Sequence, residues 1–181
     1  MHDGVGAHIS IAIRQLESGS ATSDELMQTM RDSLDQLKLT VDAIHLQNGD
    51  VTSLLANLRY RLEPRFKASE TELLWDVDLL EPLAQLDSQG MRHLQFIVYE
   101  SLSNVLQHAH ASMLCIELHA TAQGGATLRI IDNGRGFDPQ TMKSNGFSSI
   151  RERAALIGAV LCIDGTPGRT MVELKLSSKS S

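Results

Sequence analysis

The segment Asp-Asn-Gly-Arg-Gly-Phe at residues 132–137 constrains this chain of 181 residues most, because it ends an apolar run with a carboxylate and two glycines. Residues 128–131 predict a strand, so Asp132 is expected where the sheet opens into a loop. Gly134 and Gly136 are expected to adopt positive φ angles and to let backbone approach a ligand closely. A carboxylate buried there needs a hydrogen-bond donor, such as the exocyclic amine of adenine. An ordinary polar turn is the alternative.

A long amphipathic helix is predicted over residues 94–109, where apolar side chains recur three and four residues apart. Glu100, Asn104 and His108 are spaced by four residues and therefore share one face of this helix. Asn104 can serve as the single protein ligand of Mg²⁺, which often keeps waters and phosphate oxygens in its other positions. Glu100 can hold a metal-bound water or accept a proton. For each of these residues alone, the alternative is a solvated polar stripe.

Other local signals predict alternating helices and strands between residues 50 and 176. Asn48-Gly49-Asp50 indicates a domain boundary with Asp50 as a helix N-cap, and Pro64 is expected to bend or end the helix that follows. Gly124-Gly125 predicts a β-hairpin. The elements expected are strands over 72–77, 113–121, 126–132, 160–164 and 170–176, a short helical connection over 79–85, an Asp87-Ser88 cap for the long helix, and a helix over 147–157.

The first 48 residues predict a helical hairpin. One apolar stripe precedes Gly19, and a heptad-like seam follows a capping box at Thr22 and Glu25. The hairpin alone cannot bury both stripes, so we expect two copies to pair as a four-helix bundle in a dimer. The expected fold class is α+β, with a hairpin over 1–48, an α/β domain over 50–177 and a disordered tail over 178–181.

Composition argues against some classes of partner. The formal net charge is −6 and Lys and Arg do not cluster, so direct contact with nucleic acid is not expected. There is no apolar run long enough to span a bilayer and no signal-peptide pattern, so no membrane contact is expected from this segment. Cys115 and Cys162 are expected to be reduced core thiols in a cytoplasmic protein.

Three segments together resemble the ATP-binding domain of sensor histidine kinases. Glu100-x-x-x-Asn104 is similar to the N box of that family, and residues 132–137 are similar to its adenine-binding box. Residues 145–158 resemble the glycine-then-helix segment of the NarX/DesK-like branch. The resemblance covers about residues 90–176. It implies an α/β sandwich of the histidine kinase/GHKL ATPase type.

The resemblance also implies ATP and Mg²⁺ as cofactors, with Asn104 holding the magnesium ion and Glu100 acting in catalysis. Residues 138–145 would form a short lid over the nucleotide, and the helix after it could point its N-terminus at the phosphates. Gln107 differs from the Lys or Arg that relatives usually carry. The implied nucleotide contacts are Asn104, His108, Asp132, Gly134, Gly136, Phe137, Gly146 and Thr170.

The phosphoacceptor histidine of this branch lies in a His-Asp-x-x-Gly sequence, and His2 and Asp3 match that pattern. The resemblance therefore implies that His2 receives the phosphoryl group, while Asp3 orients the imidazole and accepts its proton. Members that also dephosphorylate their partner carry glutamine four residues after the aspartate. This chain carries Ala7 there, which argues against phosphatase activity.

The implied function is a two-component sensor histidine kinase core that autophosphorylates from Mg·ATP and passes the phosphoryl group to an aspartate of a response regulator. Regulators in this branch typically carry helix-turn-helix output domains. The chain would be a homodimer and cytoplasmic, alone or as the cytoplasmic portion of a longer membrane sensor. One alternative is a degenerate GHKL-type nucleotide-binding adaptor without histidine kinase activity. Another is an ATPase or a serine kinase of the same superfamily.

Overall fold

The computed structural model describes residues 46–136 and 147–178, together with five single positions nearer the N-terminus. The chain divides into two compact units, residues 1–45 and 46–181. Nearly all of the first unit lies outside the described residues, and the predicted hairpin with His2 and Asp3 lies there too. The five single positions are Ile13, Thr22, Met27, Met30 and Leu34, all helical except Thr22.

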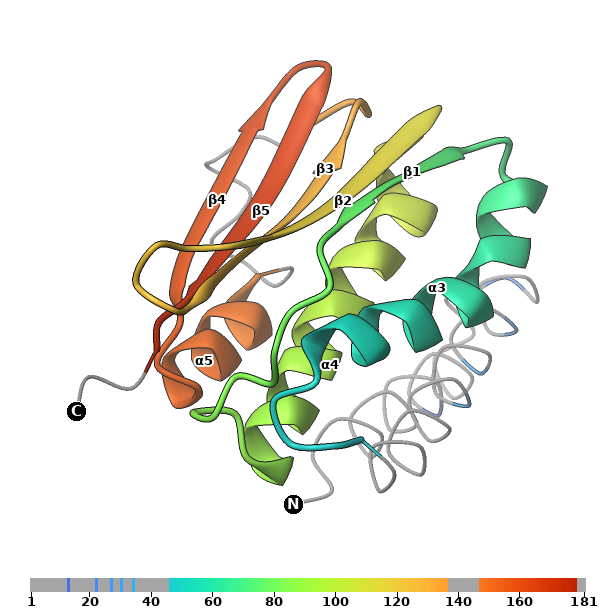
Figure 1. The fold of residues 1–181 in the computed structure, drawn as a ribbon. Coiled ribbons are helices and arrows are strands. Elements are labelled where there is room, and N and C mark those ends of the chain that lie inside the picture. The colour runs from blue at the N-terminus through green and yellow to red at the C-terminus, as the bar shows by residue number, and fades with distance from the viewer. Residues whose placement is uncertain are drawn as a thin grey trace. The chain divides into compact units, whose positions relative to one another are not determined.

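The second unit is built on a five-stranded mixed sheet in the order β1-β2-β3-β5-β4. β1 pairs with β2 in parallel, and the other neighbouring strands are antiparallel. Helices α3, α4 and α5 cover one face of the sheet (Figure 1). This arrangement confirms the predicted α/β sandwich. The elements are α3 Val51–Ala68, β1 Glu72–Val77, α4 Ser88–Asn104, the π-helical turn η2 Val105–Ala109, β2 Met113–Ala120, β3 Ala126–Asp132, α5 Ser148–Leu156, β4 Val160–Thr166 and β5 Arg169–Leu176.

The core lies between the helices and the inner face of the sheet. Alternate residues of β2 are buried there, as their period of two requires. Burial of each large aliphatic side chain stabilises the fold by about 1.5–3 kcal/mol. The fully buried side chains come mostly from α3, α4 and β2 and include Phe66, Leu54, Leu55, Leu58, Met91, Leu94, Ile97, Leu102, Leu114, Ile116 and Leu118.

Aspartate side chains begin both long helices, as predicted. Asp50 accepts a hydrogen bond from the backbone N–H of Ser53 at 2.9 Å, and Asp87 accepts one from Gly90 at 2.7 Å. Such a cap satisfies an N–H group that has no partner within the helix and contributes about 1 kcal/mol. The long helix therefore begins where its local sequence predicts.

Of the two outcomes expected at Pro64, a bend or an end of the helix, the structure excludes the end. Pro64 lies inside α3, where Leu62 and Phe66 on either side are buried and anchor the helix. A second local prediction is wrong. The segment 79–85 contains no helix. Hydrogen bonds to other segments hold its backbone instead. The N–H of Leu83 donates to the carbonyl of Gly49 at 3.0 Å, and the N–H of Leu80 donates to the hydroxyl of Thr52 in α3 at 3.3 Å.

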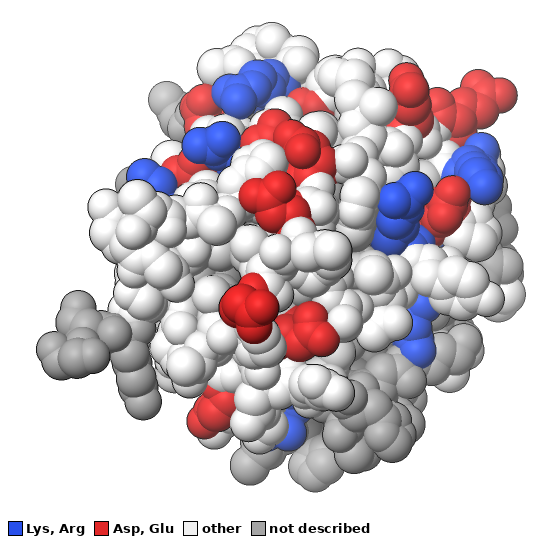
Figure 2. All heavy atoms as spheres, viewed as in Figure 1, with Lys and Arg blue, Asp and Glu red and all other residues white. Residues whose placement is uncertain are grey.

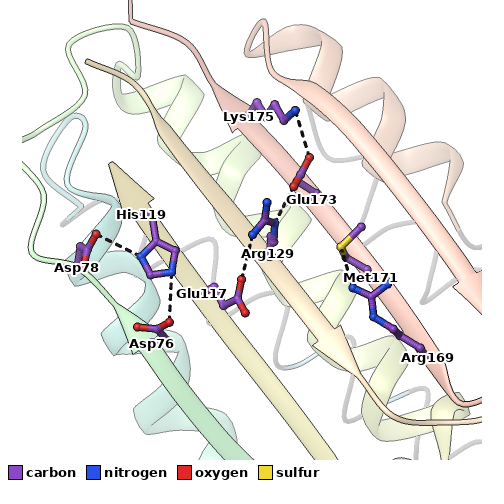
Figure 3. A network of polar contacts seen from close by, with 9 residues as sticks. All are labelled: Asp76, Asp78, Glu117, His119, Arg129, Arg169, Met171, Glu173 and Lys175. Atoms are coloured by element: carbon purple, nitrogen blue, oxygen red, sulfur yellow. Dashed lines mark hydrogen bonds and ion pairs between the residues drawn. The ribbon is translucent and has the colours of Figure 1, made fainter. Parts of the chain in front are cut away.

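The outer face of the sheet carries ion pairs (Figure 3). Arg129 Nε donates to Glu173 at 2.6 Å, and Arg129 Nη1 lies 3.4 Å from Glu117. The hydrogen bond from Arg129 holds the pKa of the buried Glu173 carboxyl below its usual value, although burial opposes this shift. His119 lies between Asp76 and Asp78, with each ring nitrogen 3.2 Å from a carboxylate oxygen.

Acidic side chains gather over the middle of the face seen in Figure 2, and Lys and Arg lie nearer its margins. Cys115 is half-buried and Cys162 is exposed, and both thiols are free. The prediction that Cys162 is a core residue is therefore wrong. Ser178, expected in a disordered tail, donates to the Gln123 carbonyl at 2.6 Å. Among the described residues, no helix combines the length and the apolar character needed to cross a bilayer.

Candidate functional site

A cavity of about 170 Å³ lies where α4 and η2 meet the strands β3 and β5. Most of its wall is apolar, with a few polar side chains among the apolar ones, as is typical of sites for small molecules. Its lining residues are Ser101, Asn104, Val105, His108, Ala109, Ile130, Asp132, Arg135, Gly136, Phe147, Thr170 and Val172.

Asp132 is the last residue of β3 and lies in the wall of the cavity, where the residue is only 4% exposed. The backbone N–H of Gly134 donates to Asp132 Oδ1 at 2.8 Å, and the side chain of Thr170 also forms a hydrogen bond to this carboxyl. Burial raises the pKa of Asp132, and the two hydrogen bonds oppose that effect. A carboxylate offers about four acceptor positions. Two donors from the protein therefore leave capacity for an N–H group of a ligand.

The two glycines after Asp132 differ in what they require. Gly136 has a φ of 72°, as predicted, and a Cβ there would collide with the carbonyl oxygen of Thr166. Gly134 does not have a positive φ, so that part of the prediction is wrong. Space excludes a side chain at Gly134, because a Cβ would collide with the carbonyl oxygen of Ala109. The close approach is therefore between two segments of the protein itself.

Asn104 and His108 both line the cavity, but Glu100 is not among the lining residues. Of the three residues predicted on one face of the helix, Asn104 and His108 are therefore the two that contact this cavity. Asn104 Nδ2 is buried and has no hydrogen-bond partner among the residues that the structure describes. A buried amide without a partner costs about 1–3 kcal/mol. Asn104 therefore has a donor available for a bound group.

The end of the long helix was predicted as α-helical, but residues 105–109 form a π-helical turn. His110 follows in the left-handed conformation with a φ of 51°. The carbonyl of Ala109, at the end of this turn, accepts a hydrogen bond from the backbone N–H of Arg135 at 2.8 Å. The turn thus connects α4 to the loop after β3. Single π turns of this kind are frequent at functional sites.

Sequence reasoning missed Arg135 and Phe147 as lining residues. Among the described residues of the lining, Arg135 carries the only permanent positive charge. It lies inside the segment 132–137 that was singled out, so a search for a cation beside the expected ligand could have found it. Phe147 immediately precedes α5. Phe137, Gly146 and the predicted lid lie outside the described residues.

A family model described as "Histidine kinase-, DNA gyrase B-, and HSP90-like ATPase" matches residues 90–177. The nitrate/nitrite sensor protein NarQ of Escherichia coli (strain K12) is 28% identical over 179 residues, which cover 94% of this chain and 31% of NarQ. The sensor histidine kinase LiaS of Bacillus subtilis (strain 168) is 28% identical over 193 residues, covering 97% of this chain and 51% of LiaS. The chain thus spans about a third to a half of the length of these curated relatives.

Solved structures with the same fold include the Acinetobacter baumannii histidine kinase AdeS, with a TM-score of 0.65 and 13% identity over 99% of each chain. The ATP binding domain of PrrB from Mycobacterium tuberculosis has a TM-score of 0.57 and 19% identity, covering 72% of this chain and 96% of that one. At these identities the likeness shows the fold alone. That fold is the GHKL-type α/β ATPase fold with a mixed sheet.

Proposed function

We propose that this chain is the core of a two-component sensor histidine kinase that uses Mg·ATP, because the model of the histidine kinase-, DNA gyrase B- and HSP90-like ATPase family matches residues 90–177. The buried Asp132 in the wall of the cavity is the observation on which this proposal mainly rests. The curated relatives NarQ and LiaS are named as sensor proteins, which supports the same class.

Asp132 and Thr170 would bind the adenine ring. The free acceptor positions of the carboxylate suit the exocyclic amine, and a hydrogen bond to a charged acceptor contributes about 1.5–3 kcal/mol. Ile130 and Val172 of the cavity wall supply apolar surface for a flat aromatic ring. Asp132 therefore selects the base, and the apolar wall contributes much of the binding free energy.

The polar residues toward α4 and the loop after β3 would bind the phosphates. The side-chain oxygen of Asn104 is a suitable single ligand for Mg²⁺, and its unpartnered Nδ2 can donate to a phosphate oxygen. Bound Mg²⁺ supplies neutralisation of the charge on the phosphate oxygens. Relatives usually carry Lys or Arg at the position of Gln107, and Arg135 would supply the positive charge in its place. His108 also lines the cavity and would contribute to phosphate binding. Glu100 would act from outside the cavity lining by holding a water or accepting a proton.

Phe137 and Gly146 would also contact the nucleotide, as the family resemblance implies. The N-terminus of α5 would approach the phosphates. Phe147, the residue before α5, makes no side-chain cap for this helix. The first N–H groups of a helix have no partner within it and favour anions. A phosphate group near Phe147 would satisfy them.

The phosphotransfer step would use His2 as the acceptor, either of the same chain or of the partner chain in a dimer. The imidazole of His2 would attack the γ-phosphorus of ATP, forming an N–P bond as the bond to the bridging oxygen breaks and ADP leaves. Asp3 would orient the imidazole and take its proton. The phosphoryl group would then pass to an aspartate of a response regulator with a helix-turn-helix output domain.

A homodimer is part of this proposal. Met30 and Leu34 belong to the heptad-like seam of the predicted hairpin, and both are helical and about half exposed, at 54% and 51%. Apolar residues at this spacing bury their surface when helices of two chains pair. Sedimentation at increasing protein concentration should show a dimer that Met30→Glu with Leu34→Glu dissociates.

Phosphate labelling tests the kinase assignment. We expect the protein to take up label from γ-labelled ATP with Mg²⁺ in a form that is stable to alkali and labile to acid, and His2→Gln should abolish it. Asp132→Asn should reduce both ATP binding and labelling. A protein that binds ATP but takes up no label would be the nucleotide-binding adaptor instead, and acid-stable label would indicate a serine or threonine kinase.

A further inference from the structure

Arg153 of α5 makes contacts with two side chains of α4. Its Nη1 lies 3.3 Å from Nδ1 of His93, and its guanidinium carbon lies 4.5 Å from the centre of the Phe96 ring. Its Nε is 3.3 Å from the hydroxyl oxygen of Ser149, one turn earlier on α5. One planar cation thus forms a stacked contact and a hydrogen bond across the interface between the two helices.

α5 depends on this interface for its position. The helix has nine residues, and within it only Ile150 and Ala154 are buried. Phe147 at its start provides no side-chain cap. A helix this short is marginal in water without tertiary packing. The contacts of Arg153 therefore add to the burial of Ile150 and Ala154 in holding α5 in place.

The same two helices bound the proposed nucleotide site. α4 contributes Ser101 and Asn104 to the cavity, and Phe147 lines it at the start of α5. Movement of α5 away from α4 would carry Phe147 away from the cavity wall. The packing of α5 on α4 is therefore coupled to the shape of the cavity.

We propose that Arg153 is a positioning residue that holds α5 against α4 and thereby keeps Phe147 in the wall of the nucleotide site. This inference rests on the proposed ATP-binding function. Arg153 is not among the cavity-lining residues, so it acts through the helix that carries it.

The contact also depends on the protonation of His93. Arginine only donates hydrogen bonds, so Nδ1 of His93 must be unprotonated to accept one. Burial lowers the pKa of His93, Arg153 and Arg92 lower it further, and Asp87 and Glu152 oppose them. The imidazole is therefore neutral near pH 7. In acid it becomes a second cation facing Arg153, and the hydrogen bond is replaced by repulsion.

Two matched arginine variants test the proposal in the full chain. Arg153→Met keeps most of the side-chain volume but removes the charge and the stacking, and Arg151→Met makes the same change at an exposed position of α5. We expect Arg153→Met to weaken Mg·ATP binding about five- to tenfold by calorimetry, as the loss of one partly buried cation–π contact together with its hydrogen bond implies. We expect faster hydrogen exchange of the amides of residues 151–157. Arg151→Met should leave both unchanged.

The pH dependence separates positioning from a general loss of stability. Hydrogen exchange in α5, corrected for its intrinsic pH dependence, should increase between pH 7 and pH 5 in the native chain. It should not increase in His93→Gln, whose side-chain oxygen accepts from Arg153 at any pH. Phe96→Leu should loosen α5 as Arg153→Met does, with thermal melting as a check that both variants are folded.

Unchanged ATP affinity and unchanged α5 exchange in a folded Arg153→Met protein would overturn the inference. So would equal losses in Arg151→Met. If the native chain does not bind ATP at all, the proposed function is wrong, and the exchange of the α5 amides still decides whether Arg153 holds this helix.

Discussion

Asp132 and Thr170 are direct partners across the β3–β5 ladder, and their side chains are hydrogen-bonded to each other in the wall of the cavity. The hydroxyl of Thr170 donates, since the carboxylate of Asp132 can only accept. A second donor, the backbone of Gly134, holds the same carboxylate from the loop side. The carboxylate is thus fixed in orientation before any ligand arrives.

Asp132→Asn should weaken ATP binding about 10- to 100-fold, because a charged acceptor for the adenine amine is replaced by a neutral amide. Calorimetry compares the affinities for ATP and for inosine triphosphate, which lacks that amine. The difference between the two affinities reports on the hydrogen bond to the amine. The native chain should prefer ATP, and the variant should lose most of this preference. Equal affinity of the native chain for both nucleotides would contradict the role of Asp132.

Arg135→Gln should weaken binding of ATP and ADP about tenfold and leave binding of adenosine unchanged, because a charge-assisted contact to phosphate contributes about 1.5–3 kcal/mol. Gln107→Lys should restore part of the loss by placing a cation where relatives carry one. Fluorescence titrations with the three ligands provide the comparison. An equal loss for adenosine would mean that Arg135 shapes the cavity and does not bind phosphate.

Gly136→Ala should destabilise the fold by about 2–4 kcal/mol, since it combines a positive φ with a collision against the Thr166 carbonyl. Gly168→Ala is a suitable control, because Gly168 also has a positive φ, of 87°, but a Cβ there would meet no atom within 4 Å. Gly168→Ala should lower the free energy of unfolding by about 1 kcal/mol, from backbone strain alone. Urea unfolding of both variants measures the difference, and equal costs would exclude the collision as its cause.

Arg129→Met should destabilise the protein at neutral pH by about 1–2 kcal/mol, because it leaves the buried Glu173 without its main partner. The expected loss of stability is this small because the Arg129 side chain is 39% exposed, and solvent screens its charge. The folded-state pKa of Glu173 lies below its ordinary value of 4.5, so the stabilisation is complete above that pH and is lost as the pH falls through the folded-state pKa.

The difference between native and Arg129→Met proteins should therefore shrink in acid. Arg169→Met removes a looser pair, 3.7 Å from Asp164 with both side chains about half exposed. Its cost should be under about 1 kcal/mol. Chemical unfolding at pH 7 and pH 3.5 tests both statements, and a difference that does not change with pH would contradict the role of Glu173.

The features that local sequence predicts well are those that local chemistry determines. Asp50 and Asp87 cap their helices through groups three residues away, and Asp132 ends its strand next to a glycine turn. The features that local sequence did not decide depend on distant contacts. α3 continues through Pro64 because buried neighbours hold it, and residues 79–85 stay irregular because they bond to other segments.

The candidate site divides in the same way. Asn104, Asp132 and Thr170 lie in recognisable motifs and line one cavity. Arg135 and Phe147 join them because the loop after β3 and the start of α5 approach the same end of α4, which no local pattern encodes. Glu100 lies four residues before Asn104 but does not line the cavity. Spacing along a helix predicts which residues share a face, but the segments that pack against that face decide which of them contact a cavity.

The π turn at residues 105–109 also limits which changes of chain length this domain tolerates. Such a turn accommodates one residue more than the regular helix over the same rise, so deleting one residue could convert it to ordinary α-helix. The deletion would shift the Ala109 carbonyl away from the Arg135 amide and rotate everything that follows relative to Asn104. Alignments of related chains should therefore place no gap here, and evolution in this segment is expected to proceed by substitution alone.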